Sequence, residues 1–218
     1  MWLTTSSVGR KVVMSLTGLF LILFLTFHVL MNAVAVISLD GYEAVCEFLG
    51  ANWYALLGTG ILAAGFVIHI IYAFWLTMQN RKARGNDRYA VSKKPASVEW
   101  ASQNMLVLGI IVAAFILIHL VNFWAKMQLP EVMGADALSG VEALEATFSQ
   151  VWLLPVYLIC FVAIWFHLTH GFWSAFQTLG TTNEKWISRW KCIGWWWATI
   201  VMALFAVEAC YLTYYFAF

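Results

Sequence analysis

The chain has 218 residues, of which 63% are hydrophobic and 11% are charged, with a formal net charge of +1. Soluble domains carry about 25% charged residues, so this composition excludes an ordinary water-soluble protein. We expect a protein of the lipid bilayer with no nucleic-acid partner.

Five apolar runs are long enough to cross a membrane, since a hydrocarbon core of about 30 Å takes about 20 residues of helix. They lie at about 12–37, 54–78, 101–125, 151–178 and 194–217. None shows the two-residue alternation of a barrel strand, so each predicts a helix. The first run is too long for the core of a signal peptide and is expected to be retained. The prediction is an all-α membrane protein with a single transmembrane domain over 1–218.

Loop charges predict the orientation. Eleven of the twelve Lys and Arg residues lie before the first run or after the second and fourth runs: Arg10, Lys11, Arg81, Lys82, Arg84, Arg88, Lys93, Lys94, Lys185, Arg189 and Lys191. The other two loops contain one cation, Lys126, and seven acids: Asp40, Glu43, Glu47, Glu131, Asp136, Glu142 and Glu145. The positive-inside rule therefore places the N-terminus in the cytoplasm and the C-terminus outside.

Two further patterns bear on the loops and the cysteines. The cysteines have no CxxC spacing, so they indicate neither a zinc site nor a disulfide framework: Cys46, Cys160, Cys192 and Cys210. The loops are too short for a soluble catalytic domain. In the segment "SGVEALEATF", the helical spacing of Val141, Leu144 and Phe148 fits either a short interfacial helix or a plain connector.

All five histidines lie inside the apolar runs: His28, His69, His119, His167 and His170. Ionisable side chains are costly in hydrocarbon and usually face a bundle interior with a partner, so each is a functional candidate. A single one could equally be a hydrogen-bonded packing residue. Their joint placement is more informative than any one of them.

Depth arranges four of these histidines in two levels. Counted from the cytoplasmic flank at about 1.5 Å per residue, His28 and His119 lie at about 26–28 Å, and His69 and His167 at about 17–20 Å. The first four runs therefore contribute one histidine each, paired as first with third and second with fourth.

Two histidines at one level on facing helices suit bis-imidazole ligation of haem iron, which takes one nitrogen on each side of the ring plane. A carboxylate-rich di-metal site would need glutamates beside them, and the first four runs have no central acid. Zinc would need three or four ligands at one depth. We therefore expect two haems b.

An internal match separates His167 from His170. The segment "HIIYAFWLTMQ" from His69 aligns with "HLTHGFWSAFQ" from His167. The matched positions are Ala73 with Gly171, Phe74 with Phe172, Trp75 with Trp173 and Gln79 with Gln177. His170 aligns with Tyr72, which favours His167 as the ligand. The small residue four positions on leaves room beside the histidine for the edge of a macrocycle.

Taken together, "SLTGLFLILFLTFH" ending at His28, the single histidine late in the second and third runs, and "HLTHGFW" from His167 resemble a known family. This is the cytochrome b membrane subunit of succinate:quinone oxidoreductases, the succinate dehydrogenase and fumarate reductase family, in its five-helix, two-haem form. The resemblance covers nearly the whole chain. It implies an outer haem held by His28 and His119, an inner haem held by His69 and His167, and His170 as an additional residue.

The resemblance also implies partners, because this chain alone would not oxidise succinate. A flavoprotein with covalently bound FAD would interconvert succinate and fumarate, and an iron–sulfur subunit would join it to the basic cytoplasmic face. Electrons would pass to or from a membrane quinone, with menaquinone expected, in a respiratory chain linked to the tricarboxylic acid cycle. The location would be a bacterial inner membrane, and two such complexes could associate as a dimer.

Haem propionates need donors or cations near the membrane surface. Candidates for the inner haem are Ser15, Arg10, Lys11, Gln103, Gln79 and Gln177. His170 could donate to an inner propionate or to a main-chain carbonyl. Candidates for the outer haem are Asn32, Asn122 and Lys126.

A quinone site needs an apolar slot, a hydrogen-bond donor and a proton route. The family's two-haem members suggest a site near the outer haem, where Asp40, Glu43 and Glu47 are the nearest acids, and Glu47 is our choice. Glu208 lies inside the fifth run, where a charge is costly, so it is expected to be protonated or to face a polar cleft.

Two other functions fit the same sequence. A two-haem cytochrome b could anchor a hydrogenase or a formate dehydrogenase instead. From another class, the chain could be a haem-free membrane scaffold or transporter with histidines along a polar path.

Overall fold

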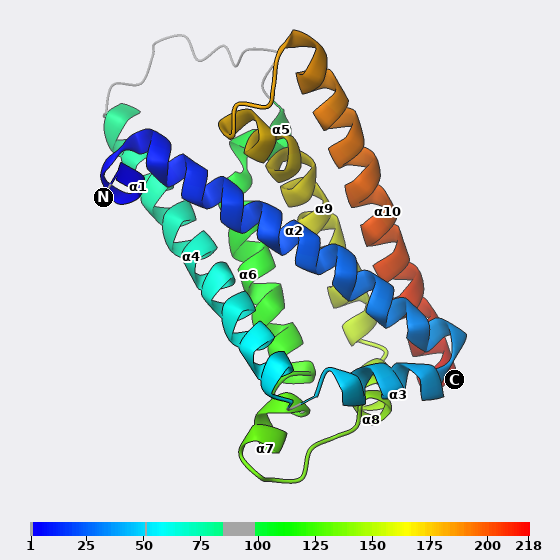
Figure 1. Ribbon diagram of the computed structural model, residues 1–218. Coiled ribbons are helices and arrows are strands. Elements are labelled where there is room, and N and C mark those ends of the chain that lie inside the picture. The colour runs from blue at the N-terminus through cyan, green and yellow to red at the C-terminus, as the bar shows by residue number, and fades with distance from the viewer. Residues whose placement is uncertain (1, 51, 85–98) are drawn as a thin grey trace.

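The computed structural model describes residues 2–50, 52–84 and 99–218, and Figure 1 shows their arrangement. Within these ranges the helices are α1 (Trp2–Thr5), α2 (Ser7–Ile37), α3 (Leu39–Phe48), α4 (Trp53–Arg84), α5 (Trp100–Gln103), α6 (Met105–Asn122), α7 (Gln128–Val132), α8 (Gly140–Phe148), α9 (Leu153–Thr178) and α10 (Glu184–Ala217). Five of them, α2, α4, α6, α9 and α10, are long and apolar enough to cross a membrane. The prediction of five helices with the length and apolar character of membrane spans is confirmed. Three of the loop cations, Arg88, Lys93 and Lys94, lie outside the described residues.

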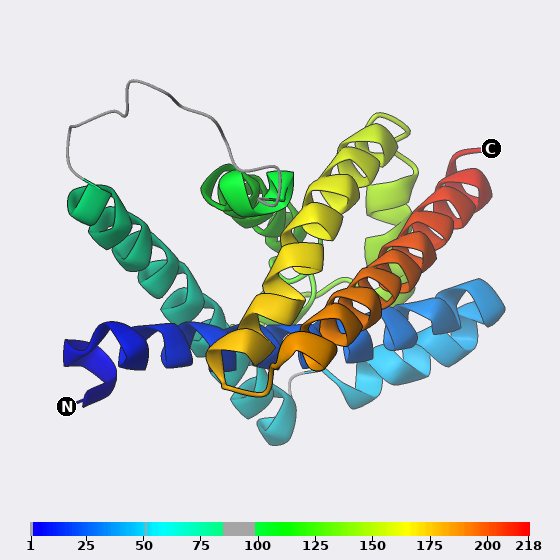
Figure 2. The ribbon, with the colours of Figure 1, turned by 90° about the horizontal axis from the view of Figure 1, so that it is seen from above.

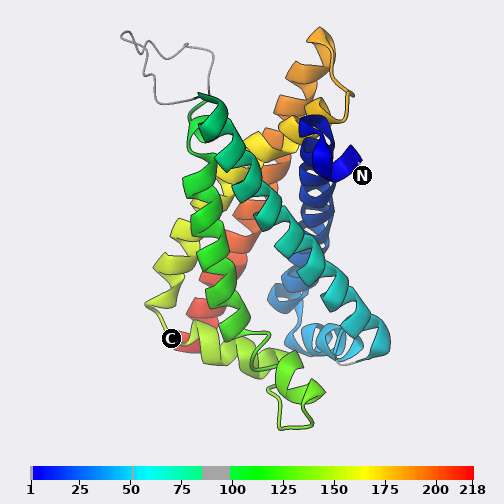
Figure 3. The ribbon, with the colours of Figure 1, turned by 90° about the vertical axis from the view of Figure 1, so that its left-hand side faces the viewer.

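The five long helices run between two ends of one bundle. We call the end that carries α1, α5 and the start of α10 the inner end, and the end that carries α3, α7, α8 and the C-terminus the outer end (Figure 1). The chain termini lie at opposite ends, as Figure 3 also shows. This arrangement agrees with an odd number of spans, while the side of the membrane that each end faces stays a prediction.

Helix α2 is central to the packing, since it lies against α4, α9 and α10, while α9 lies against α6 and α10. Seen from above, α2 crosses one side of the bundle and α6 lies on the other (Figure 2). Hydrogen bonds join the helices within the apolar interior: Trp197 Nε1 donates to Thr26 Oγ1 at 3.1 Å, and Trp165 Nε1 donates to Thr199 Oγ1 at 2.9 Å. Such bonds and close side-chain packing, rather than burial from water, hold helices together in lipid.

Several span boundaries differ from the sequence prediction. Helix α2 begins at Ser7 rather than at about 12, and α4 continues to Arg84 rather than ending at about 78. Hydrogen bonds account for two further differences. The third run does not form one helix from residue 101, because the chain turns at Asn104, whose side-chain amide donates to the carbonyl of Trp100 at 2.9 Å. The last helix begins at Glu184, ten residues earlier than the apolar run at 194, because Asn183 caps it by accepting from the N–H groups of Lys185 and Trp186. Polar residues at helix starts extend a helix beyond its apolar section without changing hydropathy.

The outer loop between α6 and α9 contains a short helix, which is one of the two interpretations of its apolar spacing. Helix α8 begins with a capping box formed by Ser139 and Glu142. Its apolar residues Leu144 and Phe148 are buried against the bundle, so α8 is part of the protein core rather than a helix lying on lipid. Glu43 of α3 fixes its first turn by accepting from the main-chain N–H groups of Gly140 at 3.1 Å and Val141 at 2.8 Å.

Candidate functional site

The structure brings four histidines together in two pairs. The rings of His28 on α2 and His119 on α6 have centres 5.7 Å apart and lie edge to face. The rings of His69 on α4 and His167 on α9 have centres 6.5 Å apart. This is the pairing that the depth count predicts, with one histidine from each of four helices. Ligation of iron by them stays a prediction.

The spacing within each pair suits two axial ligands of one metal. A ligating imidazole nitrogen lies about 2 Å from its metal, so two imidazoles on opposite sides place their ring centres about 6 Å apart. Both observed separations lie close to that value. Within the described residues, no group of three or more His, Cys, Asp or Glu side chains is arranged to hold a metal ion. Two nitrogens at each level suit a planar macrocycle that supplies the remaining ligands.

The helices that carry each pair are held apart. Neither α2 with α6 nor α4 with α9 is among the helix pairs that pack closely, although their histidine rings face each other. Directly packed helices have axes about 8–10 Å apart, which leaves no room for a flat group between them. The wider separation is what a macrocycle between two imidazoles requires.

The inner pair is oriented by the hydroxyl of Thr17. Thr17 Oγ1 donates to the carbonyl of Val13 at 2.9 Å and lies 3.1 Å from His69 Nδ1. In the tautomer with the ring proton on Nδ1, the hydroxyl oxygen accepts from His69, and Nε2 keeps its lone pair for a metal. Such bonds to the second ring nitrogen are the usual support of a metal-ligating histidine.

Glycines lie beside both rings of the inner pair. A Cβ atom added to Gly18 would lie 3.3 Å from Cε1 of His69, and one added to Gly109 would lie 3.7 Å from Cε1 of His167. At Gly171, one turn along from His167, no described residue outside its own helix has an atom within 4 Å of such a Cβ. The small residue expected beside a macrocycle edge therefore faces open space in the polypeptide. The buried Nδ1 of His167 has no hydrogen-bond partner among the described residues.

The outer pair is surrounded by aromatic rings. Phe24 and Phe205 lie near His28, with ring centres at 5.3 and 5.8 Å, and Phe115 and Phe123 lie near His119 at 6.2 and 5.0 Å. These rings give the outer pair apolar surroundings, and electrostatic interactions are stronger in such surroundings than in water.

Asn32 contacts His28 in a way that the sequence did not indicate. Its Nδ2 donates to the carbonyl of His28 at 2.8 Å and lies 3.3 Å from Nδ1 of the same residue. In the tautomer with the ring proton on Nε2, the Nδ1 atom of His28 accepts from this amide. Ligation through Nε2 requires the amide to turn so that its oxygen accepts from Nδ1–H.

His170 faces a different set of residues. Its Nδ1 lies 3.8 Å from Oε2 of Glu99, and its ring centre lies 4.9 Å from that of Trp173. It makes no ring contact with another histidine among the described residues, whereas His167 faces His69. The geometry therefore favours His167 over His170 as the partner of His69.

At the inner end, each of the two tryptophans of the internal match has a cationic side chain over its ring. The guanidinium carbon of Arg10 lies 4.9 Å from the ring centre of Trp75, and Nζ of Lys191 lies 4.5 Å from that of Trp173. Cations over indole faces are stabilised by the ring quadrupole. With its amide oxygen toward Arg10, Gln79 accepts from both terminal guanidinium nitrogens, at 2.6 and 3.1 Å.

The remaining propionate candidates have varied surroundings. At the inner end, Ser15 is buried on α2, while Lys11, Gln103 and Gln177 are exposed. At the outer end, Asn122 donates to the hydroxyl of Tyr157 at 3.0 Å, and Lys126 follows α6 in a turn. Of these, Ser15 alone is a buried polar side chain.

The acids named for the quinone region, Asp40, Glu43 and Glu47, have different surroundings from Glu208 of the fifth span, and Asp40 is exposed in the first turn of α3. Glu47 is exposed near the end of α3. Glu43 is used structurally, as the cap of α8. Glu208 is buried on α10, and its Oε1 has no hydrogen-bond partner among the described residues. Nearby on α3, burial chiefly raises the pKa of Tyr42, so that this hydroxyl stays protonated at neutral pH.

Sequence reasoning missed Thr17, Gly18, Gly109 and Glu99. A signal existed for the first two, because "LTG" lies within the first-run motif that ends at His28. Gly109 and Glu99 have no local signature, since their roles depend on which helix lies opposite.

Comparison of the chain with protein-family models, with curated proteins and with solved structures finds no match.

Proposed function

We propose that this chain is the di-haem cytochrome b membrane subunit of a succinate:quinone oxidoreductase. In this role it anchors the catalytic subunits and carries electrons between an iron–sulfur subunit and membrane quinone. The observation that carries the proposal is the presence of two histidine pairs, His28 with His119 and His69 with His167, on helices held apart. The motif resemblance then selects this family among cytochromes b.

The chain's own residues would hold and insulate the two groups. His69 and His167 would hold the inner iron, and His28 and His119 the outer iron, with Thr17 fixing the ring of His69. The phenylalanines around the outer pair give it apolar surroundings. The haems, when bound, would supply reversible one-electron chemistry. The protein tunes that chemistry through axial ligands, hydrogen bonds to them and burial.

The inner end supports the docking of partner subunits. Several of its cations are exposed: Lys11, Arg81, Lys82, Lys185 and Arg189. A surface of this sign attracts and orients an acidic partner. We propose that the iron–sulfur subunit docks here, carrying with it the flavoprotein that holds FAD, on the cytoplasmic side of a bacterial inner membrane.

The quinone site is proposed at the outer end. Glu47 is exposed at the outer end, which suits proton exchange with water, and we propose it as an acid of a menaquinone site near the outer pair. Exchange of protons by a positioned carboxyl group is the chemistry that quinone reduction and oxidation need.

Haem content, spectrum and bound partners test the proposed function. We expect the complex purified through this chain to hold two haems per chain, to show a reduced-minus-oxidised b-type difference spectrum and to contain a subunit with covalent flavin. A di-haem spectrum with a hydrogenase or formate dehydrogenase subunit in place of the flavoprotein would contradict the family assignment. A preparation with no haem absorption would contradict every redox role and leave a scaffold or transporter.

A further inference from the structure

Two cavities lie in line along the groove between α9 and α10. The one at the inner end has a volume of about 310 Å³, and the one below it, toward the middle of the bundle, has about 270 Å³. Trp165 lines both of them. Its Nε1 donates to Thr199 Oγ1 at 2.9 Å, and its ring lies 6.2 Å from that of Trp195. The two spaces therefore lie next to each other on the two sides of Trp165.

The inner cavity has aromatic walls and a charged pair. Trp100, Trp173 and Trp195 are among the aromatic residues that line it. Lys191 Nζ donates to Oε1 of Glu99 at 2.7 Å and lies 4.5 Å from the ring centre of Trp173. The cavity therefore presents one anion and one cation side by side.

The carboxyl of Glu99 is charged at neutral pH, and both side chains of the pair are partly exposed. Partial burial alone would raise the pKa of the Glu99 carboxyl, but the hydrogen bond and charge of Lys191 outweigh it and hold that pKa below its usual value. The two side chains are 40% and 41% exposed. Each can thus bind a further ion of opposite sign.

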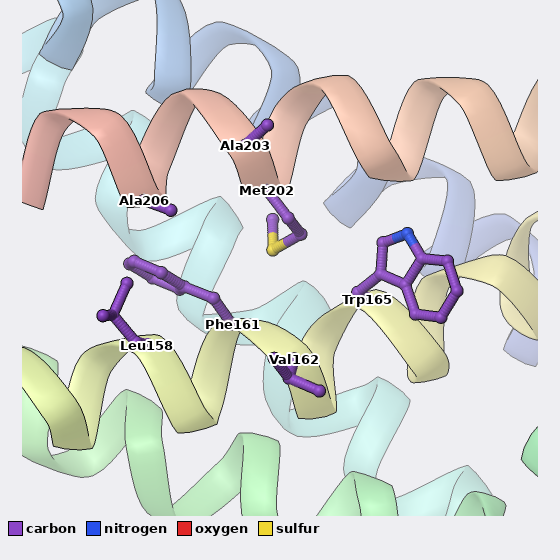
Figure 4. A pocket seen from close by; sticks show the side chains of 7 residues that line it. All are labelled: Leu158, Phe161, Val162, Trp165, Met202, Ala203 and Ala206. Atoms are coloured by element: carbon purple, nitrogen blue, oxygen red, sulfur yellow. The ribbon is translucent and has the colours of Figure 1, made fainter.

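The second cavity is apolar and opens toward lipid. Figure 4 shows Phe161 and Met202 lying between the two helices, with Val162 nearby. The small side chains of Ala203 and Ala206 form part of the α10 side. Val162 is 57% exposed on the flank of the bundle, so a hydrocarbon chain can enter from the side.

We propose that this groove binds one phospholipid with a zwitterionic headgroup that bears a primary ammonium, of the phosphatidylethanolamine class. Its ammonium binds the carboxylate of Glu99, its phosphate binds the ammonium of Lys191, and one acyl chain follows the apolar cavity past Trp165. Charge complementarity selects this class, because an anionic headgroup bound to Lys191 would be repelled by the adjacent carboxylate of Glu99, and a headgroup without charge would bind neither member of the pair.

The dimensions of the groove fit this occupant. From Trp173 to Leu158 the helix rises about 22 Å, at about 1.5 Å per residue. Half of a hydrocarbon core is about 15 Å thick, so this length takes a headgroup at the surface and much of an acyl chain below it. Such a lipid would hold α5 against α9 and α10. The proposal does not depend on haem binding.

Native mass spectrometry of the detergent-purified full chain, equilibrated with equal amounts of phosphatidylethanolamine, phosphatidylcholine and phosphatidylglycerol, tests the proposal. We expect one phosphatidylethanolamine per chain, retained about tenfold over phosphatidylglycerol. Glu99→Gln should reverse that preference toward phosphatidylglycerol, because the phosphate partner Lys191 stays while the carboxylate is lost. Lys191→Met should reduce retention of all three lipids.

A groove-filling variant separates the site from general lipid adhesion. Ala203→Phe occupies the apolar cavity from a lipid-facing position and should abolish the bound lipid. Ala63→Phe, on an exposed position of α4, is the matched control and should retain it. Preference of the unaltered chain for phosphatidylglycerol, unchanged retention in Ala203→Phe, or a quinone in place of a phospholipid would each overturn the proposal.

Discussion

Thr17 on α2 holds the ring of His69 on α4, with 3.1 Å between the threonine hydroxyl oxygen and Nδ1 of the histidine. The pair joins two helices at the level where the inner haem is proposed. Thr17→Val removes the acceptor while keeping the shape of the side chain. Loss of such a bond costs about 10- to 100-fold in metal affinity, so we expect weaker retention of the inner haem during purification.

The control for this variant is Thr77→Val. Thr77 lies on α4 and its hydroxyl donates to the carbonyl of Ala73 at 2.8 Å, so it tests the loss of a hydroxyl without contact to a histidine ring. Haem content per chain after dilution is the readout. Equal haem loss in both variants, or in neither, would contradict a specific role for Thr17.

Gly171 offers a test of the space beside His167. Apart from its own helix, no described residue has an atom within 4 Å of a Cβ atom built there, so the polypeptide leaves space for the first side-chain atom of Gly171→Leu. If a macrocycle edge lies in that space, the leucine displaces it and the chain keeps its fold but holds one haem in place of two. Gly58→Leu on α4, where the surroundings are equally open, should keep both. A Gly171→Leu protein with two haems would show that the macrocycle lies elsewhere.

Glu43 ties α3 to α8 through two main-chain N–H groups, at 3.1 and 2.8 Å. Glu43→Gln replaces a charged acceptor at a helix N-terminus with a neutral one. We expect a loss of about 1–3 kcal/mol in the free energy of unfolding and a lower melting temperature in detergent. Glu47→Gln changes an exposed acid on the same helix and should leave the melting temperature unaltered, so equal melting of the two variants would refute the capping role.

The thiol of Cys46 should be unreactive at neutral pH. Burial raises its pKa to about 11, although the hydrogen bond to Tyr42 acts in the opposite direction. At neutral pH its thiolate fraction is therefore about 100-fold below that of an unperturbed thiol. Cys192 is exposed at the inner end. A water-soluble maleimide at pH 7 should label Cys192 quickly and Cys46 slowly, and the rate at Cys46 should rise with pH up to about 11. Fast labelling of Cys46 at pH 7 would place this thiol in water.

The spanning helices could be predicted from hydropathy because membrane thickness fixes the length of an apolar run. Helix α9, for example, ends at the predicted residue, Thr178. Gly180 follows in a left-handed conformation (φ 77°), which is a common way for a helix to end. The break at Asn104 could not be predicted from hydropathy, because a side-chain hydrogen bond to a carbonyl leaves the apolar character of the run unchanged. The short helix α3 was missed for a related reason, as its polar and charged residues resemble a loop.

The histidine pairing was predictable because the rise per residue converts sequence position into depth. The rise per residue does not predict which way a side chain points around the helix axis. His167 and His170 differ by less than one turn in height but face different neighbours, His69 and Glu99. The internal match supplied that direction by comparison within the chain. The contacts of Thr17 and Asn32 depend on how each helix is rotated in the bundle, which no local pattern specifies.

Haem quantification on the unaltered chain and on five single alanine variants tests the central proposal most directly. We predict two haems per chain, the loss of one in His28→Ala, His69→Ala, His119→Ala and His167→Ala, and both retained in His170→Ala. Loss of a haem in His170→Ala with retention in His167→Ala would contradict the assignment of the inner ligand. Absence of haem from the unaltered chain would contradict the whole account.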